Sequence, residues 1–226
     1  MRSLAAAALA AALAACAGTP EAPADTTGPR IGVVVLHGEG DDPYGQTLRF
    51  TRTLIRDGFL TDSPEMPWST RRAYDAGVNA AMKEIDAAAA RLKSRGAQKV
   101  FVAGHGLGAA AAVGYATLRR VDGVIALAPG HNPDGSKKGA EYFDPDGAMS
   151  FRVNGPRIRA GTPVLWIVGD TEYPGLRKAD EAAFQALQRN PPPKFVEVAA
   201  GHFDTPDAAA RAAVDWIRQI ANGVKK

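Results

Sequence analysis

Cysteine is almost absent from this chain of 226 residues, since Cys16 is the only one. One cysteine cannot form an intramolecular disulfide bond, so no such bond stabilises the folded domain. The four histidines show none of the short spacings that metal-binding pairs adopt; they are His37, His105, His131 and His202. We therefore expect neither a metal ion nor another cofactor.

Long segments of one charge sign are missing as well. The formal net charge is only +3, with a pI near 9.1, and the basic residues are scattered among acidic ones. Nucleic-acid-binding domains usually carry a basic patch or stripe. We therefore expect no nucleic-acid partner. The sequence predicts no particular oligomeric state.

The apolar run near the N-terminus is too short to span a bilayer, which takes about 20 residues. The run extends from Leu4 to Ala15 and follows one early positive charge, Arg2, as secretion signals do. It ends in Leu13-Ala14-Ala15-Cys16, which resembles a bacterial lipobox, where the cysteine takes a lipid. Residues 1–15 are therefore expected to be a lipoprotein signal peptide.

The lipobox resemblance implies a mature protein that begins at lipidated Cys16 and is held in the membrane by acyl chains. Ala17 stands where some lipoproteins have aspartate, which implies the outer membrane, with the domain facing the periplasm. The alternative is a chance cysteine behind an ordinary signal peptide. Residues 16–30 have three prolines and no bulky apolar side chain, so beyond Cys16 we expect a flexible tether, followed by one domain over residues 31–226.

That domain alternates short apolar runs, rich in β-branched residues, with longer segments of helical period. This pattern predicts an α/β fold with a doubly wound, mostly parallel sheet and helices on both faces. The expected strands are Ile31–Leu36, Lys99–Ala103, Gly123–Ala128, Pro163–Val168 and Lys194–Val198, with a weaker one near Phe59.

Two long helices are expected to cover this sheet. One has apolar residues at helical spacing and ends at Gly96; they are Tyr74, Val78, Met82, Ile85 and Leu92. The other begins with Thr205 as its cap and Pro206 in its first turn, and stops near Asn222-Gly223. The aperiodic stretch from His131 to Gly161 is too short for a full lid domain and is expected to form part of a pocket rim.

The segment from Val102 to Ala110 reads as a strand that enters a helix through a tight turn, Gly104-His105-Gly106-Leu107-Gly108. It resembles the nucleophile elbow, G-x-S-x-G, of the α/β-hydrolase superfamily, with Gly106 at the serine position. Small residues are needed around such an elbow because strand and helix approach closely. The wider chain resembles a bacterial subgroup related to dienelactone hydrolases over nearly all of residues 31–221, on the evidence of the elbow, the long helix, Pro67-Trp68-Ser69 and Ala128-Pro129-Gly130-His131.

The resemblance assigns further roles at the carboxyl ends of the strands. The backbone N–H groups of Glu39 and Leu107 would form an oxyanion hole. Glu172, three residues after Gly169, takes the position of the acid, and His202 that of the catalytic histidine. The chain order of elbow, acid and histidine is that of the family.

Other interpretations of these residues fit the sequence less well. A dinucleotide site would need glycine at Ala109 and an acidic residue after the second strand, and neither is present. A lone His202 or Glu172 could be an ordinary loop or surface residue. The side chain of His105 is expected to point away from the reacting centre, and Ser69 has no elbow to expose it.

Glycine offers no oxygen or sulfur nucleophile, so a covalent acyl-enzyme is excluded at Gly106. Three hypotheses follow. The first is a degenerate hydrolase that binds a small ester-like ligand or a partner, and the second is an esterase-type hydrolase that uses water activated by His202 and Glu172. The third is a recent or artificial loss of the serine. The enzymatic class implied by the resemblance is carboxylic-ester hydrolase, inactive as a serine hydrolase. The sequence does not name the substrate.

Overall fold

The computed structural model describes residues 28–129, 149, 151–185, 187 and 191–223. The predicted signal peptide and Cys16 lie outside these residues, as do His131 and most of the expected pocket rim. Within the described residues, no helix is both long and apolar enough to cross a membrane.

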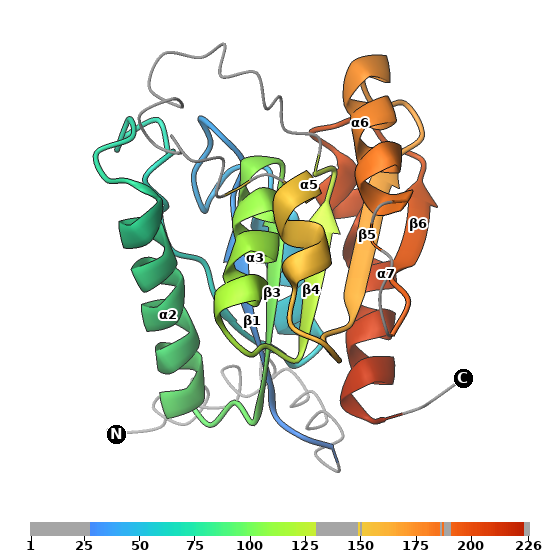
Figure 1. Ribbon diagram of the computed structural model, residues 1–226. Helices are drawn as coiled ribbons and strands as arrows, with labels where there is room; N and C mark the ends of the chain where they lie inside the picture. The colour runs from blue at the N-terminus through green and yellow to red at the C-terminus, as the bar shows by residue number, and fades with distance from the viewer. Residues whose placement is uncertain (1–27, 130–148, 150, 186, 188–190, 224–226) are drawn as a thin grey trace, which may run out of the picture.

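Six parallel strands form one open sheet in the order β2-β1-β3-β4-β5-β6 (Figure 1). The strands are β1 (Ile31–Leu36), β2 (Leu60–Asp62), β3 (Lys99–His105), β4 (Gly123–Leu127), β5 (Val164–Gly169) and β6 (Lys194–Val198). This is the doubly wound parallel sheet predicted from the sequence. The expected bounds differ from the observed ones by at most two residues, and the weak strand near Phe59 is β2.

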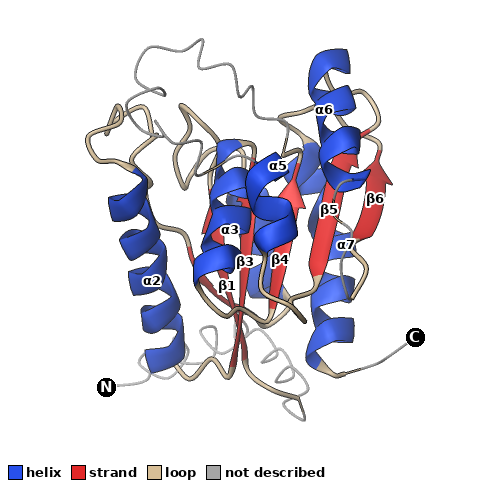
Figure 2. Ribbon diagram, in the orientation of Figure 1, coloured by secondary structure: helices blue, strands red, loops and turns tan. Residues whose placement is uncertain are grey.

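The helices are α1 (Leu48–Arg56), α2 (Val78–Ser94), α3 (Leu107–Leu118), α5 (Phe151–Asn154), α6 (Pro174–Gln185) and α7 (Thr205–Ala221), with a short 3₁₀ turn η1 (Gly155–Arg157). Helices α1 and α7 pack on one face of the sheet, and α2, α3 and α6 on the other (Figure 2). Both faces are therefore covered, as expected.

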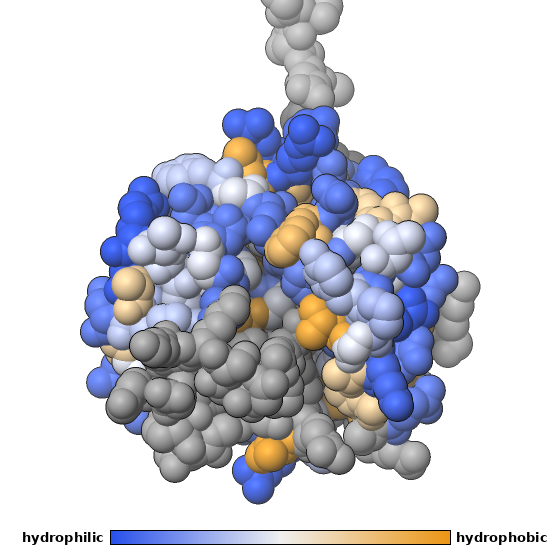
Figure 3. Space-filling view, turned by 90° about the horizontal axis from the view of Figure 1, so that it is seen from above, coloured by the Kyte–Doolittle hydropathy of each residue, from blue (hydrophilic) through white to orange (hydrophobic). Residues whose placement is uncertain are grey.

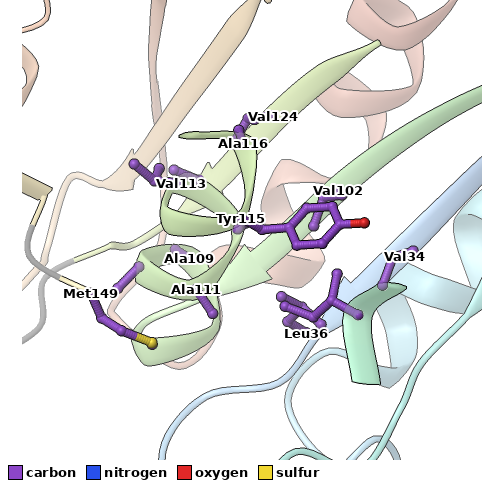
Figure 4. Packing of buried hydrophobic residues seen from close by; sticks show 14 of the residues in the cluster. Val34, Leu36, Val102, Ala109, Ala111, Val113, Tyr115, Ala116, Val124 and Met149 are labelled. Carbon is purple, nitrogen blue, oxygen red and sulfur yellow. The ribbon is translucent and has the colours of Figure 1, made fainter. Parts of the chain in front are cut away.

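Alternating side chains of each strand enter the two cores. In β1, Val33 and Val35 face the α1/α7 side, whereas Val34 and Leu36 face the α2/α3 side. Helix α3 presents mostly alanine and glycine, so it packs closely on the centre of the sheet (Figure 4). This close approach of α3 fixes the turn that precedes it.

Two local expectations were wrong. Helix α2 begins at Val78, and Tyr74 lies in the preceding turn with a positive φ of 61°. Asp204, and not Thr205, occupies the N-cap of α7. The Thr205 hydroxyl donates to the carbonyl oxygen of Gly201 at 2.8 Å, so it ties the helix to the preceding loop instead of accepting from the first turn.

Candidate active site

The turn between β3 and α3 places Gly106 at the carboxyl edge of the sheet. Its dihedral angles, φ 52° and ψ −117°, lie where residues with a β-carbon are strained. Its N–H donates to the carbonyl oxygen of Leu127 at 3.1 Å. The chain thus makes a sharp, anchored turn from strand to helix at the position that the sequence resemblance gives to the nucleophile.

The glycines on either side of Gly106 are required by close packing. A β-carbon on Gly104 would lie 2.1 Å from the carbonyl oxygen of Gly108. One on Gly108 would lie 2.5 Å from the carbonyl oxygens of Leu36 and His37. Because no heavy atom can come this close to backbone atoms, side chains at these two positions would push α3 away from β1 and β3.

Glu172 and His202 come from the loops after β5 and β6 and meet beside this turn. His202 Nδ1 lies 2.8 Å from Glu172 Oε2, and the Glu172 side chain is fully buried whereas that of His202 is 11% exposed. A carboxylate accepts hydrogen bonds, so the pairing assigns the proton of a neutral imidazole to Nδ1. The lone pair of His202 is then on Nε2.

His202 Nε2 faces Gly106. It lies 3.7 Å from the position that a β-carbon on Gly106 would occupy, and among the described, non-adjacent residues no other heavy atom lies within 4 Å of that position. A group of one or two heavy atoms therefore fits between Gly106 and the imidazole. The structure thus brings the vacant nucleophile position, Gly106, together with His202 and Glu172, the expected catalytic pair.

The two expected oxyanion-hole residues lie in the loop after β1 and at the start of α3. Leu107 is the first residue of α3, where backbone N–H groups have no partner within the helix. Glu39 lies in the loop after β1, and its carboxylate accepts a hydrogen bond from the Tyr74 hydroxyl. Sequence analysis had assigned Tyr74 to a helix, but Tyr74 contacts this loop instead.

His37 shapes the loop that carries Glu39. Its Nδ1 donates to the carbonyl oxygen of Gly38 at 2.8 Å, and its Nε2 accepts from the N–H of Met66 at 3.0 Å. Burial lowers the pKa of His37, which favours the neutral ring that this pair of bonds needs. Trp68 Nε1 also donates to the His37 carbonyl oxygen, at 2.9 Å.

His105 lies where β3 enters the turn, and its side chain also contacts the loop that carries His202. Its ring is buried, lies 4.8 Å from the His202 ring between centroids, and donates from Nε2 to the carbonyl oxygen of His202 at 3.0 Å. Burial, followed by repulsion from His202, lowers the pKa of His105 to about 3. A neutral His105 therefore supports the backbone of the loop that carries His202.

Other candidates have structural roles. The Ser69 hydroxyl is buried, donates to Glu65 at 2.8 Å and accepts from the Arg72 N–H at 3.1 Å, so it fixes a loop. Among the described residues, no cluster of three or more histidine, cysteine or acidic side chains could hold a metal ion. Sequence analysis missed Tyr173 and Phe203, the direct neighbours of Glu172 and His202, whose rings contact that of His202.

No protein-family profile matches this chain, and neither does any curated protein. Solved structures do match. Est1E from Butyrivibrio proteoclasticus has a TM-score of 0.68 at 15% identity, covering 88% of this chain and 91% of its own. A dienelactone hydrolase from Anabaena variabilis has a TM-score of 0.63 at 19% identity, covering 85% and 88%. A monoacylglycerol lipase from Paleococcus ferrophilus has a TM-score of 0.59 at 19% identity, covering 85% and 96%.

The chain has the α/β-hydrolase fold. At these low identities the likeness establishes the architecture and not the reaction, which depends on the residues of the site. In this fold, ligands bind at the carboxyl ends of the parallel strands, where Gly106, Glu172 and His202 lie. Figure 3 looks onto that edge and shows hydrophobic side chains in small separate groups among hydrophilic ones.

Proposed function

We propose that this protein is a carboxylic-ester hydrolase in which a water molecule, activated by His202 and oriented by Glu172, takes the place of the missing serine. The observation that carries this proposal is the space that the described residues leave between Gly106 and His202 Nε2, with the Glu172–His202 pair aligned at 2.8 Å. A protein that only binds a ligand does not need a buried carboxylate to orient an imidazole.

The reaction would proceed in one addition and one elimination. His202 Nε2 accepts a proton from water while the water oxygen bonds to the ester carbonyl carbon. The N–H groups of Glu39 and Leu107 would stabilise the resulting oxyanion. The tetrahedral intermediate then expels the alcohol oxygen, which takes the proton from His202. The products are the acid and the alcohol, and no covalent acyl-enzyme forms.

The expected rate is low, because water is a poorer nucleophile than a serine held in the elbow. In subtilisin, whose fold is different, removal of the catalytic serine lowers turnover by about 10⁶-fold and leaves about 10³–10⁴-fold over the uncatalysed reaction. Residual catalysis of this size is measurable with activated esters.

A second candidate function is ligand binding without turnover, which Gly106 itself favours. In this case the protein is a degenerate hydrolase that retains the pocket and recognises an ester-like ligand or a partner. The serine was lost, and the Glu172–His202 pair is a remnant. Both candidates use the same pocket, so they differ in whether His202 moves a proton.

The decisive experiment measures p-nitrophenyl acetate hydrolysis by the purified native protein and by the variants His202→Ala and Gly106→Ser. We expect slow turnover by the native protein that His202→Ala lowers to the buffer rate. Turnover that is unchanged in His202→Ala would contradict water activation. An inert native protein with an active Gly106→Ser variant would support the degenerate hydrolase, or a recent loss of the serine.

We also propose that Cys16 carries a lipid that anchors the protein in the outer membrane, with the domain in the periplasm. Its support is the lipobox-like sequence alone. The test is metabolic labelling with a radioactive fatty acid. Label in the native protein and none in Cys16→Ser is expected, whereas equal absence of label in both would show an ordinary secreted protein.

A further inference from the structure

Two aromatic side chains stand exposed beside the proposed catalytic pair. Tyr173 directly follows Glu172 and is 55% exposed, and Phe203 directly follows His202 and is 53% exposed. Their ring centroids lie 6.4 Å apart at an interplanar angle of 75°, an edge-to-face arrangement. Single exposed apolar residues are common on protein surfaces, but two in contact beside the catalytic pair form an apolar surface that a ligand can use.

The same rings contact the imidazole that would move the proton. The His202 ring centroid lies 5.2 Å from that of Phe203 and 6.1 Å from that of Tyr173. The Tyr173 N–H also donates to Glu172 Oε1 at 2.8 Å, so the carboxylate that orients His202 also fixes the backbone of Tyr173. The position of this aromatic pair is thus set relative to His202 Nε2.

The chemistry of the proposed reaction decides which part of a substrate meets these rings. His202 returns its proton to the oxygen of the leaving alcohol, so that oxygen must lie within hydrogen-bond distance of Nε2. The acyl carbon lies towards Gly106 and the oxyanion donors. The group attached to the leaving oxygen therefore extends past His202, whose ring is in contact with those of Tyr173 and Phe203.

We propose that Tyr173 and Phe203 form a subsite for an apolar ring in the alcohol part of the substrate, so that the preferred substrates are esters of aryl-bearing alcohols. This inference rests on the proposed function of the same site. It predicts that these two residues make the protein selective for the alcohol part of the ester and do not affect selectivity for the acyl part. Stacking on two rings gives a binding advantage of about tenfold over an alkyl group.

The first test needs no turnover. N-benzylacetamide and N-ethylacetamide are unreactive analogues of the corresponding acetate esters, and their binding to the purified native protein is followed by NMR titration. We expect N-benzylacetamide to bind about tenfold more tightly, and Tyr173→Ala/Phe203→Ala to abolish the difference. Tyr44→Ala, which removes a 72% exposed aromatic ring from another loop, is the matched control and should retain the difference. Equal affinity for the two amides in the native protein would overturn the proposal.

The second test uses turnover, in the native protein or in Gly106→Ser, and compares kcat/KM for benzyl acetate with that for ethyl acetate. The double alanine variant should lower this ratio about tenfold, whereas the ratio for methyl phenylacetate against methyl acetate should stay constant. A displaced His202 would lower kcat/KM for all esters alike, and such a general loss cancels in these ratios. The variant Tyr173→Leu/Phe203→Leu repeats the test with bulkier side chains. Loss of selectivity on the acyl side instead would overturn the assignment. Absence of all hydrolysis together with selective amide binding would reject the proposed reaction but keep the subsite.

Discussion

The imidazole of His105 donates a 3.0 Å hydrogen bond to the backbone carbonyl oxygen of His202, 97 residues further along the chain. A carbonyl oxygen only accepts, so the Nε2 atom of His105 carries the proton. The bond joins the turn that holds Gly106 to the loop that holds His202. The distance between Gly106 and His202 Nε2 therefore depends on His105.

Removal of this bond should lower activity without unfolding the protein. In the Gly106→Ser background, we expect His105→Ala to reduce kcat for p-nitrophenyl acetate about tenfold or more, with a smaller change in KM, because His202 is held less well. His105→Gln keeps an N–H donor at a similar distance from the backbone and should restore a large part of the rate. Equal rates in all three proteins would show that His105 does not position His202.

His105 should also make the stability of the fold depend on pH. Its pKa is lowered to about 3 in the folded protein, against about 6.5 in an unfolded chain. Between these values the unfolded chain binds more protons, so the free energy of unfolding rises with pH across this window. The contribution of His105 to the free energy of unfolding is complete above about pH 6.5. It is lost as the pH falls, by about 1 kcal/mol per pH unit between pH 6 and pH 5.

Urea unfolding at pH 6.5, 6.0, 5.5 and 5.0 measures this dependence. In the variant His105→Gln, the free energy of unfolding should rise with pH less steeply, by about 1 kcal/mol per pH unit. Burial also lowers the pKa of His37, which adds a slope of the same sign that remains in His105→Gln. The same slope in native and variant proteins would mean that His105 is not held neutral in the folded state.

The sequence alone predicted the sheet because each strand is a short apolar run and lies between segments of helical period. It misplaced the start of α2, because Tyr74 continues the apolar spacing backwards while its backbone adopts a positive φ to reach Glu39. Apolar periodicity indicates which side chains are buried. It does not distinguish a helical residue from one whose backbone is not helical but whose side chain is still directed inward.

The site residues were predicted from their order and from their places after strands, and they do lie together. What the sequence could not give is the contact between segments far apart in the chain. The bond from His105 to His202 and the contacts of Tyr173 with His202 and Phe203 depend on how the loops after β3, β5 and β6 meet. The sequence offered one signal for these two aromatic residues, which is that they directly follow Glu172 and His202 in the chain.

Replacement of Glu172 by glutamine tests the catalytic pair directly. Glutamine keeps the volume but loses the charge that orients and stabilises the imidazole, so we expect kcat to fall about a hundredfold or more in any active form of the protein. Asp170→Asn is the matched control, because Asp170 lies two residues earlier and accepts from the Ala200 N–H at 3.0 Å, a bond that asparagine can keep. Comparable losses in both variants would indicate a general disturbance of this loop and not a role for the Glu172 carboxylate.

Gly106 relieves strain that a side chain would create. With φ at 52° and ψ at −117°, a residue with a β-carbon costs about 1–3 kcal/mol even though the space towards His202 is open. We expect Gly106→Ala to lower the free energy of unfolding in urea by this amount. Gly161→Ala, at φ 82° with no atom of the described residues within 4 Å, should show a cost of similar origin. Gly175→Ala has as much room among the described residues but no positive φ, so it should change stability by less than about 0.5 kcal/mol. If Gly106→Ala is as stable as Gly175→Ala, the turn relaxes on substitution. In that case a serine at position 106 would not be held at the reacting position, and Gly106→Ser should remain inactive.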